Sequence, residues 1–496
     1  MVLFENIRFL DTTLRDGEQT PGVALTKEKK LLIARALDEM KVSVIEAGSA
    51  ITSEGERESI KAVANAGLNA EICSYCRIVK MDVDHALECD VDSIHLVAPV
   101  SDLHIRTKIK KDRDAVRQIA AEVTEYAKDH GLIVELSGED ASRADPEFLK
   151  AIYADGIDAG ADRLCFCDTV GLLVPEKTTE IFRDLSSSLK APISIHCHND
   201  FGLATANTIA ALAAGAKQAH VTINGLGERA GNAALEEVVM NLEWLYKYDT
   251  GIKHEQIYRT SRLVSRLTGI PVSPNKALVG GNAFTHEAGI HVHGLLADKA
   301  TYEPMSPEYI GRQRQIVLGK HAGRSSITLA LKETGLEADE AQTEEIFNRV
   351  KQMGDQGKHI TDADLQTIAE TVLDIYKEPL VKLEEFTIVS GNRVTPTASI
   401  KLNVKDKIIV QAGIGNGPVD AVINAIRVAV SSCAEDIILE EYHVDSITGG
   451  TDALVEVRVK LSKNGKVITA SGARTDIIMA SVEAVMNGMN RLIRVE

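Results

Sequence analysis

The sequence predicts an α/β protein: a (β/α)8 TIM barrel, then a helical linker region, then a C-terminal α+β domain. Three observations predict this organisation. From residue 7 to about 245, short apolar runs alternate with longer amphipathic patterns. After residue 250 the chain becomes rich in Gly, Pro and His and shows little periodicity. From about residue 380, strand-like runs and a helix follow in the order βββα, and this order then repeats.

The barrel prediction rests on eight strand candidates separated by helical patterns. Helices are expected at 27–40, 112–129, 175–189 and 233–246, and Thr26 and Asp145 supply helix-start signals. Eight βα units in about 240 residues fit a TIM barrel. The alternative, an open doubly wound sheet, rarely repeats eight times so evenly, and no G-x-G-x-x-G opens a helix. The strand candidates are 7–12, 42–48, 70–76, 93–99, 133–139, 163–169, 193–199 and 218–224.

Polar residues alternate with apolar residues along several of these strands. In a barrel the apolar phase faces the helices, and the other phase points inward and becomes polar at the C-terminal mouth. The pattern therefore places an inward-facing polar set near the carboxyl ends of the strands. Its members are His95, Glu135, Ser137, Glu139, Cys165, Cys167, Thr169, His220, Thr222 and Asn224.

The sequence after the barrel predicts two further parts. We expect a catalytic barrel at 1–250, a linker region with lid residues at 251–378, and a C-terminal domain at 379–496. The stretch 269–294 is expected to be a linker or lid, with helices at 324–334, 340–353 and 362–375. The echo of 410–430 in 468–488 indicates a pseudo-symmetric domain that binds a ligand or forms a dimer.

Composition excludes several classes of protein. The chain is 44% hydrophobic and 26% charged, as soluble globular proteins are, and its net charge is −17 without a basic stripe, which argues against nucleic acid as a partner. No apolar run could span a bilayer and no signal peptide is evident, so we expect no membrane partner and a cytoplasmic protein. Seven cysteines, with no second Cys pair to complete a zinc motif, are expected to be small residues in a reduced interior.

The seventh strand, "ISIHCHND", points to a metal site. His196 and His198 lie on its inner face, which makes either half of a divalent-metal site or a pair of hydrogen-bonded interior histidines. Asp16 follows the first strand and Asn232 follows the eighth, and both strands neighbour the seventh in a closed barrel. These four residues predict a site with open positions, which Zn, Mn, Mg or Co could occupy.

Longer motifs carry a family resemblance. The chain resembles the metal-dependent acyl-CoA condensing enzymes, which are the isopropylmalate, homocitrate and citramalate synthases. The resemblance extends over nearly the whole chain and implies a Claisen-type condensation of acetyl-CoA with a 2-oxo acid, followed by thioester hydrolysis. The motifs are "FLDTTLRDGEQTPG", "EAGS", "DTVG", "HCHNDFGLATAN", "NGLGERAGN", "HEAGIHVHG" and "ATYEP".

The residues suit that chemistry. Arg15 can stabilise the oxyanion that develops on the carbonyl, unless it only forms a salt bridge at the mouth. Thr169 could bind the substrate carboxylate, or else cap a helix. The resemblance implies that Glu139 is the catalytic base. It also implies that His291 and Tyr302 act in the partner's active site of a homodimer, although composition alone would place them on an exposed linker.

Substrate choice rests on two departures from the isopropylmalate synthases. The chain has "CFCDTVG" where those enzymes have Asn-x-Pro, and "EAGSAITSEGER" where they tend to have "EAGFP". Both departures resemble citramalate synthases, which use pyruvate; 2-oxoisovalerate, the isopropylmalate synthase substrate, is the alternative. A tight pocket could exclude the larger branch. The expected lining residues are Tyr75, His95, Ser137, Cys165 and Cys167.

The C-terminal repeat favours feedback control by a branched-chain amino acid, isoleucine for a citramalate synthase and leucine for an isopropylmalate synthase. The turns 413–418 and 449–453 are candidate effector loops, or else tight connections that need glycine at positive φ. Two other functions are alternatives: a carbon–carbon lyase of the hydroxymethylglutaryl-CoA type, and a metal-binding regulatory protein without catalysis.

Overall fold

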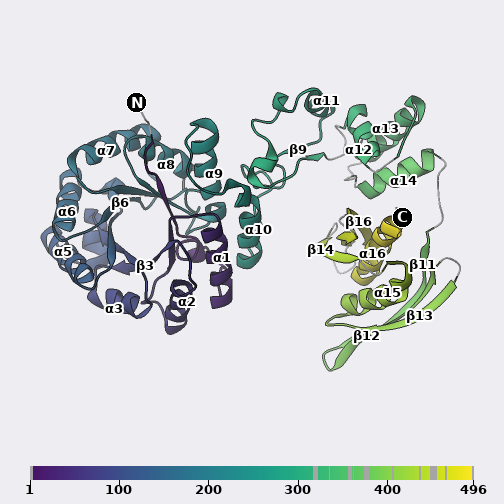
Figure 1. The fold of residues 1–496 in the computed structure, drawn as a ribbon, viewed down its shortest axis with the longest axis horizontal. Helices are drawn as coiled ribbons and strands as arrows, with labels where there is room; N and C mark the ends of the chain where they lie inside the picture. Colours follow the sequence, from purple (N-terminus) through teal and green to yellow (C-terminus); the bar gives the residue numbers. More distant parts are fainter. Residues whose placement is uncertain are drawn as a thin grey trace. The chain divides into compact units, whose positions relative to one another are not determined.

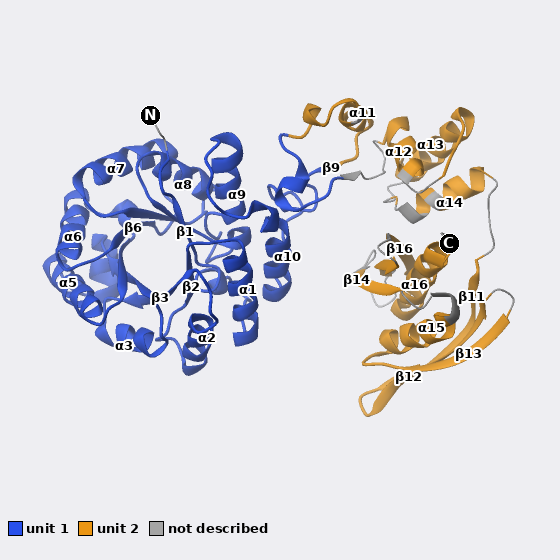
Figure 2. Cartoon of the chain, in the orientation of Figure 1, with its two compact units in different colours: residues 1–284, 304–314 blue, residues 285–303, 315–496 orange. Residues whose placement is uncertain are grey.

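The computed structural model describes residues 4–316, 322–333, 336–355, 360, 362–373, 379–404, 407–434, 437–446, 455–463 and 466–493. The chain divides into two compact units (Figure 2). The first comprises Met1–Phe284 and Pro304–Arg314, and the second comprises Thr285–Glu303 and Gln315–Glu496. Within the described ranges, no helix combines the length and the hydrophobicity that crossing a membrane requires.

The first unit is a closed barrel of eight parallel strands in sequential order, which confirms the predicted fold (Figure 1). Strand β1 pairs with both β2 and β8, and this pairing closes the ring. The strands are β1 (Arg8–Asp11), β2 (Val44–Gly48), β3 (Glu71–Arg77), β4 (Ser93–Pro99), β5 (Ile133–Glu139), β6 (Arg163–Asp168), β7 (Ile193–Cys197) and β8 (Gln218–Val221).

Helices surround the barrel (Figure 1). Two start signals read from the sequence are present: Thr26 accepts a hydrogen bond from the Lys29 amide, and Asp145 accepts one from the Phe148 amide at 2.9 Å. The helices are α1 (Lys27–Glu39), α2 (Glu54–Ala64), α3 (Lys80–Glu88), the single turn α4 (Asp102–His104), α5 (Arg113–Asp129), α6 (Pro146–Asp158), α7 (Pro175–Ser188), α8 (Ala204–Ala213), α9 (Leu235–Met240) and α10 (Ile257–Thr268).

The two faces of the barrel strands have different environments. Leu136 and Phe166 point outward and lie in the large core between strands and helices. Leu10, Val44 and Cys73 form a small separate cluster from the inward phase of neighbouring strands. The alternation therefore directs apolar side chains to the helices and leaves the inward phase for polar groups near the mouth.

Four strands, β1, β6, β7 and β8, end earlier than the sequence predicted, and the structure shows the cause for β8 and β6. Strand β8 ends at Val221, because the Thr222 backbone pairs with Ala233 and Leu235 instead, and Asn224 has a φ of 63°, which a strand does not allow. Strand β6 ends at Asp168, whose carboxylate accepts hydrogen bonds from the backbone amides of 172 and 173 and so turns the chain. Thr222, Asn224 and Thr169 therefore lie in loops.

The predicted helix at 233–246 is also shorter. Helix α9 covers Leu235–Met240, and a single π-helical turn, Asn241–Leu245, follows it. The expected absence of periodicity at 269–294 is likewise corrected, since helix α11 (Gly289–Ala297) begins within this stretch. A Cβ on Gly289 would lie 2.5 Å from Gly323 Cα, so glycine is needed there for close packing of two backbones.

Three helices of the second unit match the predicted ranges: α12 (Arg324–Glu333), α13 (Glu340–Asp355) and α14 (Asp362–Val372). They enclose a small core that includes Ile327, Ile346 and Leu365. A pair of two-residue strands, β9 (Thr285–His286) and β10 (Gln315–Ile316), also belongs to this unit.

The C-terminal part has the predicted βββα order twice. Each half is a three-stranded antiparallel sheet followed by a helix, and one core with side chains from both halves joins them. The elements are β11 (Val381–Gly391), β12 (Val394–Val404), β13 (Lys407–Ile414), α15 (Pro418–Ala434), β14 (Ile438–Ser446), β15 (Val455–Lys463), β16 (Lys466–Arg474) and α16 (Ile477–Ile493).

One candidate effector loop has a packing role. A Cβ on Gly413 would lie 2.5 Å from the Ala425 amide nitrogen, and one on Gly415 would lie 2.4 Å from that of Ala421. These glycines allow the turn 413–418 to approach α15, and neither has the positive φ expected from the sequence. The other candidate loop, 449–453, lies outside the described residues.

We expect the Phe166→Ala variant to lose about 3–5 kcal/mol of unfolding free energy, because Phe166 is 1% exposed and its ring lies 5.6 Å from that of Phe182. Urea denaturation followed by circular dichroism measures this loss. The matched control is Phe201→Ala, which removes a ring that is 73% exposed. Equal effects of the two substitutions would contradict the burial of Phe166.

Candidate functional site

A cavity of about 520 Å³ opens at the carboxyl ends of the barrel strands, where TIM barrels hold their active sites. Its lining residues come from the ends of β3 to β7, from the start of α2, and from the segments that follow β1, β2, β4, β6, β7 and β8. They are Arg15, Asp16, Glu18, Gln19, Ser49, Thr52, Ser53, Glu56, Tyr75, His95, Val97, Lys108, Glu139, Cys167, Thr169, His196, His198, Glu228 and Arg229.

This cavity brings together most of the catalytic, substrate and metal residues expected from the sequence, but five do not line it, and two of these, His291 and Tyr302, belong to the second unit. Ser137 and Cys165 are fully buried and do not line it, because each precedes a lining residue by two positions and so lies one layer deeper in the barrel. Asn232 is also absent from the lining, and its side chain contacts Asp16 instead.

Asp16, His196 and His198 converge as a metal site requires. The Nε2 atoms of the two histidines lie 3.3 Å apart. Asp16 Oδ2 lies 3.6 Å from His196 Nε2 and 3.8 Å from His198 Nε2. Atoms about 2.1 Å from a common ion lie roughly 3.0–3.4 Å apart at octahedral or tetrahedral angles. The three atoms therefore need only small shifts to share one divalent ion.

Asn232 adds a fourth candidate ligand, an amide oxygen, to this group. Its amide nitrogen donates to Asp16 Oδ1 and to the Leu226 carbonyl, both at 3.0 Å, which fixes the orientation of the amide. Its Oδ1 atom is buried and has no hydrogen-bond partner within the described part of the chain. A buried acceptor without a partner is costly, and a metal ion would satisfy it.

The charge states also favour a metal. Burial lowers the pKa of His196 well below its usual value, and the nearby His198 lowers it further. Burial likewise lowers the pKa of His198. Burial opposes ionisation of Asp16, but the charge of Arg15, together with His196, His198 and the hydrogen bond from Asn232, outweighs burial and lowers the pKa of Asp16. Two neutral imidazoles and one carboxylate are the protonation states that bind a divalent ion, so the residues fit such a group.

Glu46, which the sequence analysis did not single out as a site residue, holds two cationic groups at the cavity. Its Oε2 accepts from Arg15 Nε at 2.8 Å, and its Oε1 lies 2.7 Å from His95 Nδ1. Burial disfavours protonation of His95, but the charge of Glu46 raises the pKa of His95 to about 9. The available signal was an acidic residue, in "EAGS", at the end of an otherwise apolar strand.

Glu139 lies at the end of β5 and forms an ion pair with Lys108. Its two carboxylate oxygens lie 2.6 and 2.8 Å from Lys108 Nζ. Thr169, one residue after β6, accepts a hydrogen bond from the Asp140 amide, and its carbonyl accepts one from Arg229. The sequence did not indicate Lys108 and Arg229, because their loop positions follow no periodic pattern. Together with Arg15, these two residues supply positive charge around the cavity.

Tyr75 and His95 make one wall of the cavity. Their rings contact edge to face at 5.9 Å, and the Arg15 guanidinium lies 5.0 Å from the centre of the Tyr75 ring. Separately, in the second unit, His291 and Tyr302 contact each other with ring centres 4.2 Å apart. His291 also lies beside His286, which is 3.2 Å from Glu303.

Comparisons with known families divide the chain into three matched regions. Residues 6–264 match the family described as HMGL-like, and this match covers the barrel. Residues 278–358 match the description "Homocitrate synthase post-HMGL domain-like". Residues 359–493 match the description "LeuA allosteric (dimerisation) domain".

Two curated relatives are similar over nearly their whole length. The chain is 95% identical over 483 residues to "Putative (R)-citramalate synthase CimA" of Methanosarcina acetivorans, which covers 97% of this chain and 100% of the relative. It is 55% identical over 489 residues to (R)-citramalate synthase CimA of Methanocaldococcus jannaschii, which covers 98% of this chain and 99% of the relative.

A solved structure supports the barrel fold. The HMG-CoA lyase of Bacillus subtilis has a TM-score of 0.50 and 22% sequence identity to this chain, and the likeness covers 56% of this chain and 98% of the lyase. At this identity the likeness shows the fold alone.

We expect Asn232→Ala to weaken Mn²⁺ binding about 10- to 100-fold, because the substitution removes both the free oxygen and the hydrogen bond that orients Asp16. Isothermal titration calorimetry of the metal-free protein measures the affinity. Asn65→Ala, at an exposed helix end, is the control. An unchanged affinity in Asn232→Ala would exclude this asparagine from the metal site.

Proposed function

We propose a specific reaction for this chain, which belongs to the (R)-citramalate synthase family. The chain is an acyltransferase that condenses acetyl-CoA with pyruvate and hydrolyses the thioester to give (R)-citramalate and CoA. The observation that carries the proposal is the convergence of Asp16, His196 and His198 beside Arg15 at the barrel mouth. We further propose that this is the first step of a pyruvate route to isoleucine.

A divalent ion held by Asp16, His196, His198 and Asn232 would make the carbonyl carbon of the 2-oxo acid electrophilic. Arg15 is positioned to stabilise the developing oxyanion. Its Nε and Nη1 donate to Glu46 and Asp16, which fixes the plane of the guanidinium while one edge of it lines the cavity. Zn, Mn, Mg and Co all suit this donor set.

Glu139 is proposed as the base that removes a proton from the acetyl methyl group. Its carboxylate lines the cavity, and the ion pair with Lys108 fixes its orientation there. A carboxylate can accept several hydrogen bonds, so Lys108 leaves capacity for the incoming proton. The resulting enolate attacks the carbonyl carbon of pyruvate, and the alkoxide that forms is stabilised by hydrogen bonding from Arg15 until it takes a proton from solvent and becomes the hydroxyl.

The cavity wall supports a small 2-oxo acid. Tyr75 and His95 contact each other, Arg15 lies over the Tyr75 ring, and Glu46 is hydrogen-bonded to His95, so the wall can yield little to a larger branch. Cys167 and Thr169 complete the lining, and the charges of His95 and Arg15 suit a substrate carboxylate. We propose that Ser137 and Cys165 act from the layer below by fixing the depth of this wall. The runner-up substrate is 2-oxoisovalerate.

The C-terminal domain supports a homodimer, because its family is described as a dimerisation domain. We propose that His291 and Tyr302 complete the active site of the partner subunit, and their mutual contact suits a joint role. We also propose that isoleucine binds the C-terminal domain as a feedback inhibitor.

The reaction is tested by measuring, with a thiol reagent, the CoA that metal-supplemented protein releases from acetyl-CoA in the presence of a 2-oxo acid. We expect kcat/KM to be at least about tenfold higher for pyruvate than for 2-oxoisovalerate or 2-oxoglutarate, because a rigid wall penalises each added carbon. The Glu139→Gln variant should lose activity, and a chelator should abolish CoA release. A preference for 2-oxoisovalerate would identify an isopropylmalate synthase and leucine as its expected inhibitor.

The shared active site predicts complementation between two inactive variants. We expect a refolded equal mixture of Glu139→Gln and His291→Ala to regain about a quarter of wild-type activity, because about half of the dimers are mixed and each has one intact site. The control is a mixture of His291→Ala and Tyr302→Ala. It should stay inactive, because every subunit then contributes a defective linker to its partner's active site. Failure of the first mixture would place His291 in its own subunit's site.

A further inference from the structure

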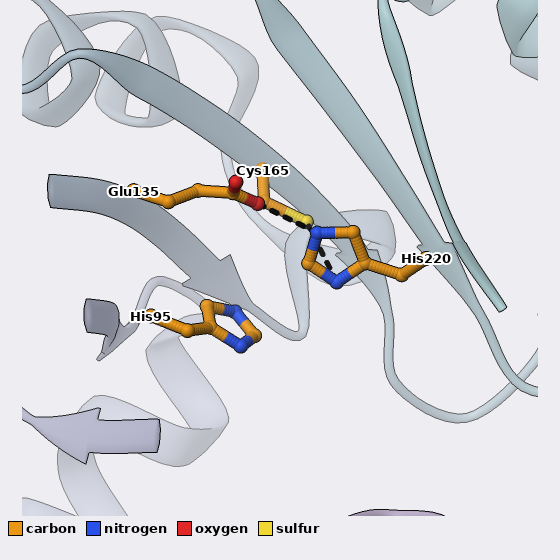
Figure 3. Close-up of side chains that lie close together, drawn as sticks. All are labelled: His95, Glu135, Cys165 and His220. Atoms are coloured by element: carbon orange, nitrogen blue, oxygen red, sulfur yellow. Dashed lines mark hydrogen bonds and ion pairs between the residues drawn. The ribbon is translucent and has the colours of Figure 1, made fainter. Parts of the chain in front are cut away.

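A second cluster of metal-ligating side chains lies inside the barrel, one layer below the cavity. His95, Glu135, Cys165 and His220 come from β4, β5, β6 and β8, and one ligand atom from each lies within 4.8 Å of the others (Figure 3). All four side chains are buried. No step of the proposed reaction uses His220 or the thiol of Cys165 as a reacting group.

Cys167 places a second thiol beside the one in this cluster, at the spacing of a metal site. Cys165 Sγ and Cys167 Sγ lie 3.9 Å apart on the inward phase of β6. Two thiolates on one tetrahedral ion, with bonds of about 2.3 Å, lie roughly 3.8 Å apart. The thiols can therefore bind one ion together with very little movement.

Each of the two histidines is backed by a buried carboxylate. His220 Nε2 lies 2.6 Å from Glu135 Oε1, which leaves Nδ1 facing Cys165 Sγ at 3.9 Å. His95 Nδ1 lies 2.7 Å from Glu46, and its Nε2 atom has no hydrogen-bond partner among the residues that the structure describes. Figure 3 shows the His95 ring turned toward Cys165 and His220. A carboxylate behind a histidine is the usual support of a metal-binding imidazole.

Glu135 serves as such a support and not as a ligand. Besides His220, its carboxylate accepts hydrogen bonds from Arg163 Nε at 2.9 Å and from Gln218 Nε2 at 2.6 Å. These three donors engage both oxygens and hold the carboxylate in place against His220. The atoms left for an ion are two sulfurs and two imidazole nitrogens, which is a soft donor set.

We propose that Cys165, Cys167, His95 and His220 form a second metal site, for a thiophilic ion such as Zn²⁺ or Cd²⁺. This site differs in chemistry from the oxygen-containing one at Asp16, although the His220 ring lies 5.6 Å from that of His196. Cys167 and His95 line the cavity and give the ion a way in. On binding, the two thiols and His95 release their protons to solvent.

The test uses Cd²⁺ with the full-length chain in excess Mg²⁺, which occupies oxygen-rich sites and does not bind thiols. We expect a bound Cd²⁺ with an ultraviolet thiolate-to-metal band and a ¹¹³Cd NMR shift typical of two sulfur ligands, distinct from the shift of any Cd²⁺ at the nitrogen and oxygen ligands of the Asp16 site. Because the shift is read on the unaltered protein, this result does not depend on how any variant folds. A Cd²⁺ signal from oxygen and nitrogen ligands only would overturn the proposal.

Three matched variants locate the site. Cys165→Ala and Cys167→Ala should each weaken Cd²⁺ binding at least about tenfold and abolish the two-sulfur signal. Cys197→Ala, which removes an equally buried thiol that packs in the core between barrel and helices, should leave both unchanged. Equal behaviour of all three variants would also overturn the proposal. CoA release is not measured, so this outcome is independent of the proposed reaction.

Discussion

The buried carboxylate of Glu46 is the group on which the candidate site depends. It accepts from Thr12, holds Arg15 and pairs with His95, so one residue of β2 orients groups from the β1 loop and from β4. Burial opposes its ionisation, but the charge of Arg15, then that of His95, lowers its pKa well below the usual value. Removing this carboxylate would leave two buried cations unpaired, at a cost of about 3–5 kcal/mol, so the positions of Arg15 and His95 depend on Glu46.

Closure of the barrel brings the rest of the site to this group. Strand β1 pairs with β8, and β7 pairs with β8, so the loop with Asp16 meets His196, His198 and Asn232 although the sequence separates them by about two hundred residues. The same closure stacks the inward residues in layers. His196 lies at the mouth, while Glu135 lies below it and pairs with Arg163 and His220.

The barrel interior is unusually polar, and each buried charge there has a partner. Arg163 joins Glu71 to Glu135, Glu135 joins His220, and Glu46 joins His95 to Arg15. Such networks specify the positions of their members because an unpaired buried charge is costly. The polar interior therefore keeps the imidazoles in fixed orientations, which serves both the site at the mouth and the thiol-containing cluster below it.

The sequence by itself determined the eight βα units, the C-terminal repeat and the inward phase of His95, Glu139, His196 and His198, because residue periodicity reports which face a side chain occupies. It did not reveal that Glu46 joins Arg15 to His95, that Lys108 pairs with Glu139, or that Cys165 lies deeper than Cys167. Those facts depend on strand register and on loops whose residues follow no periodic pattern. Only the closed barrel decided them, because register sets the depth of each residue and closure sets its neighbours across the interior.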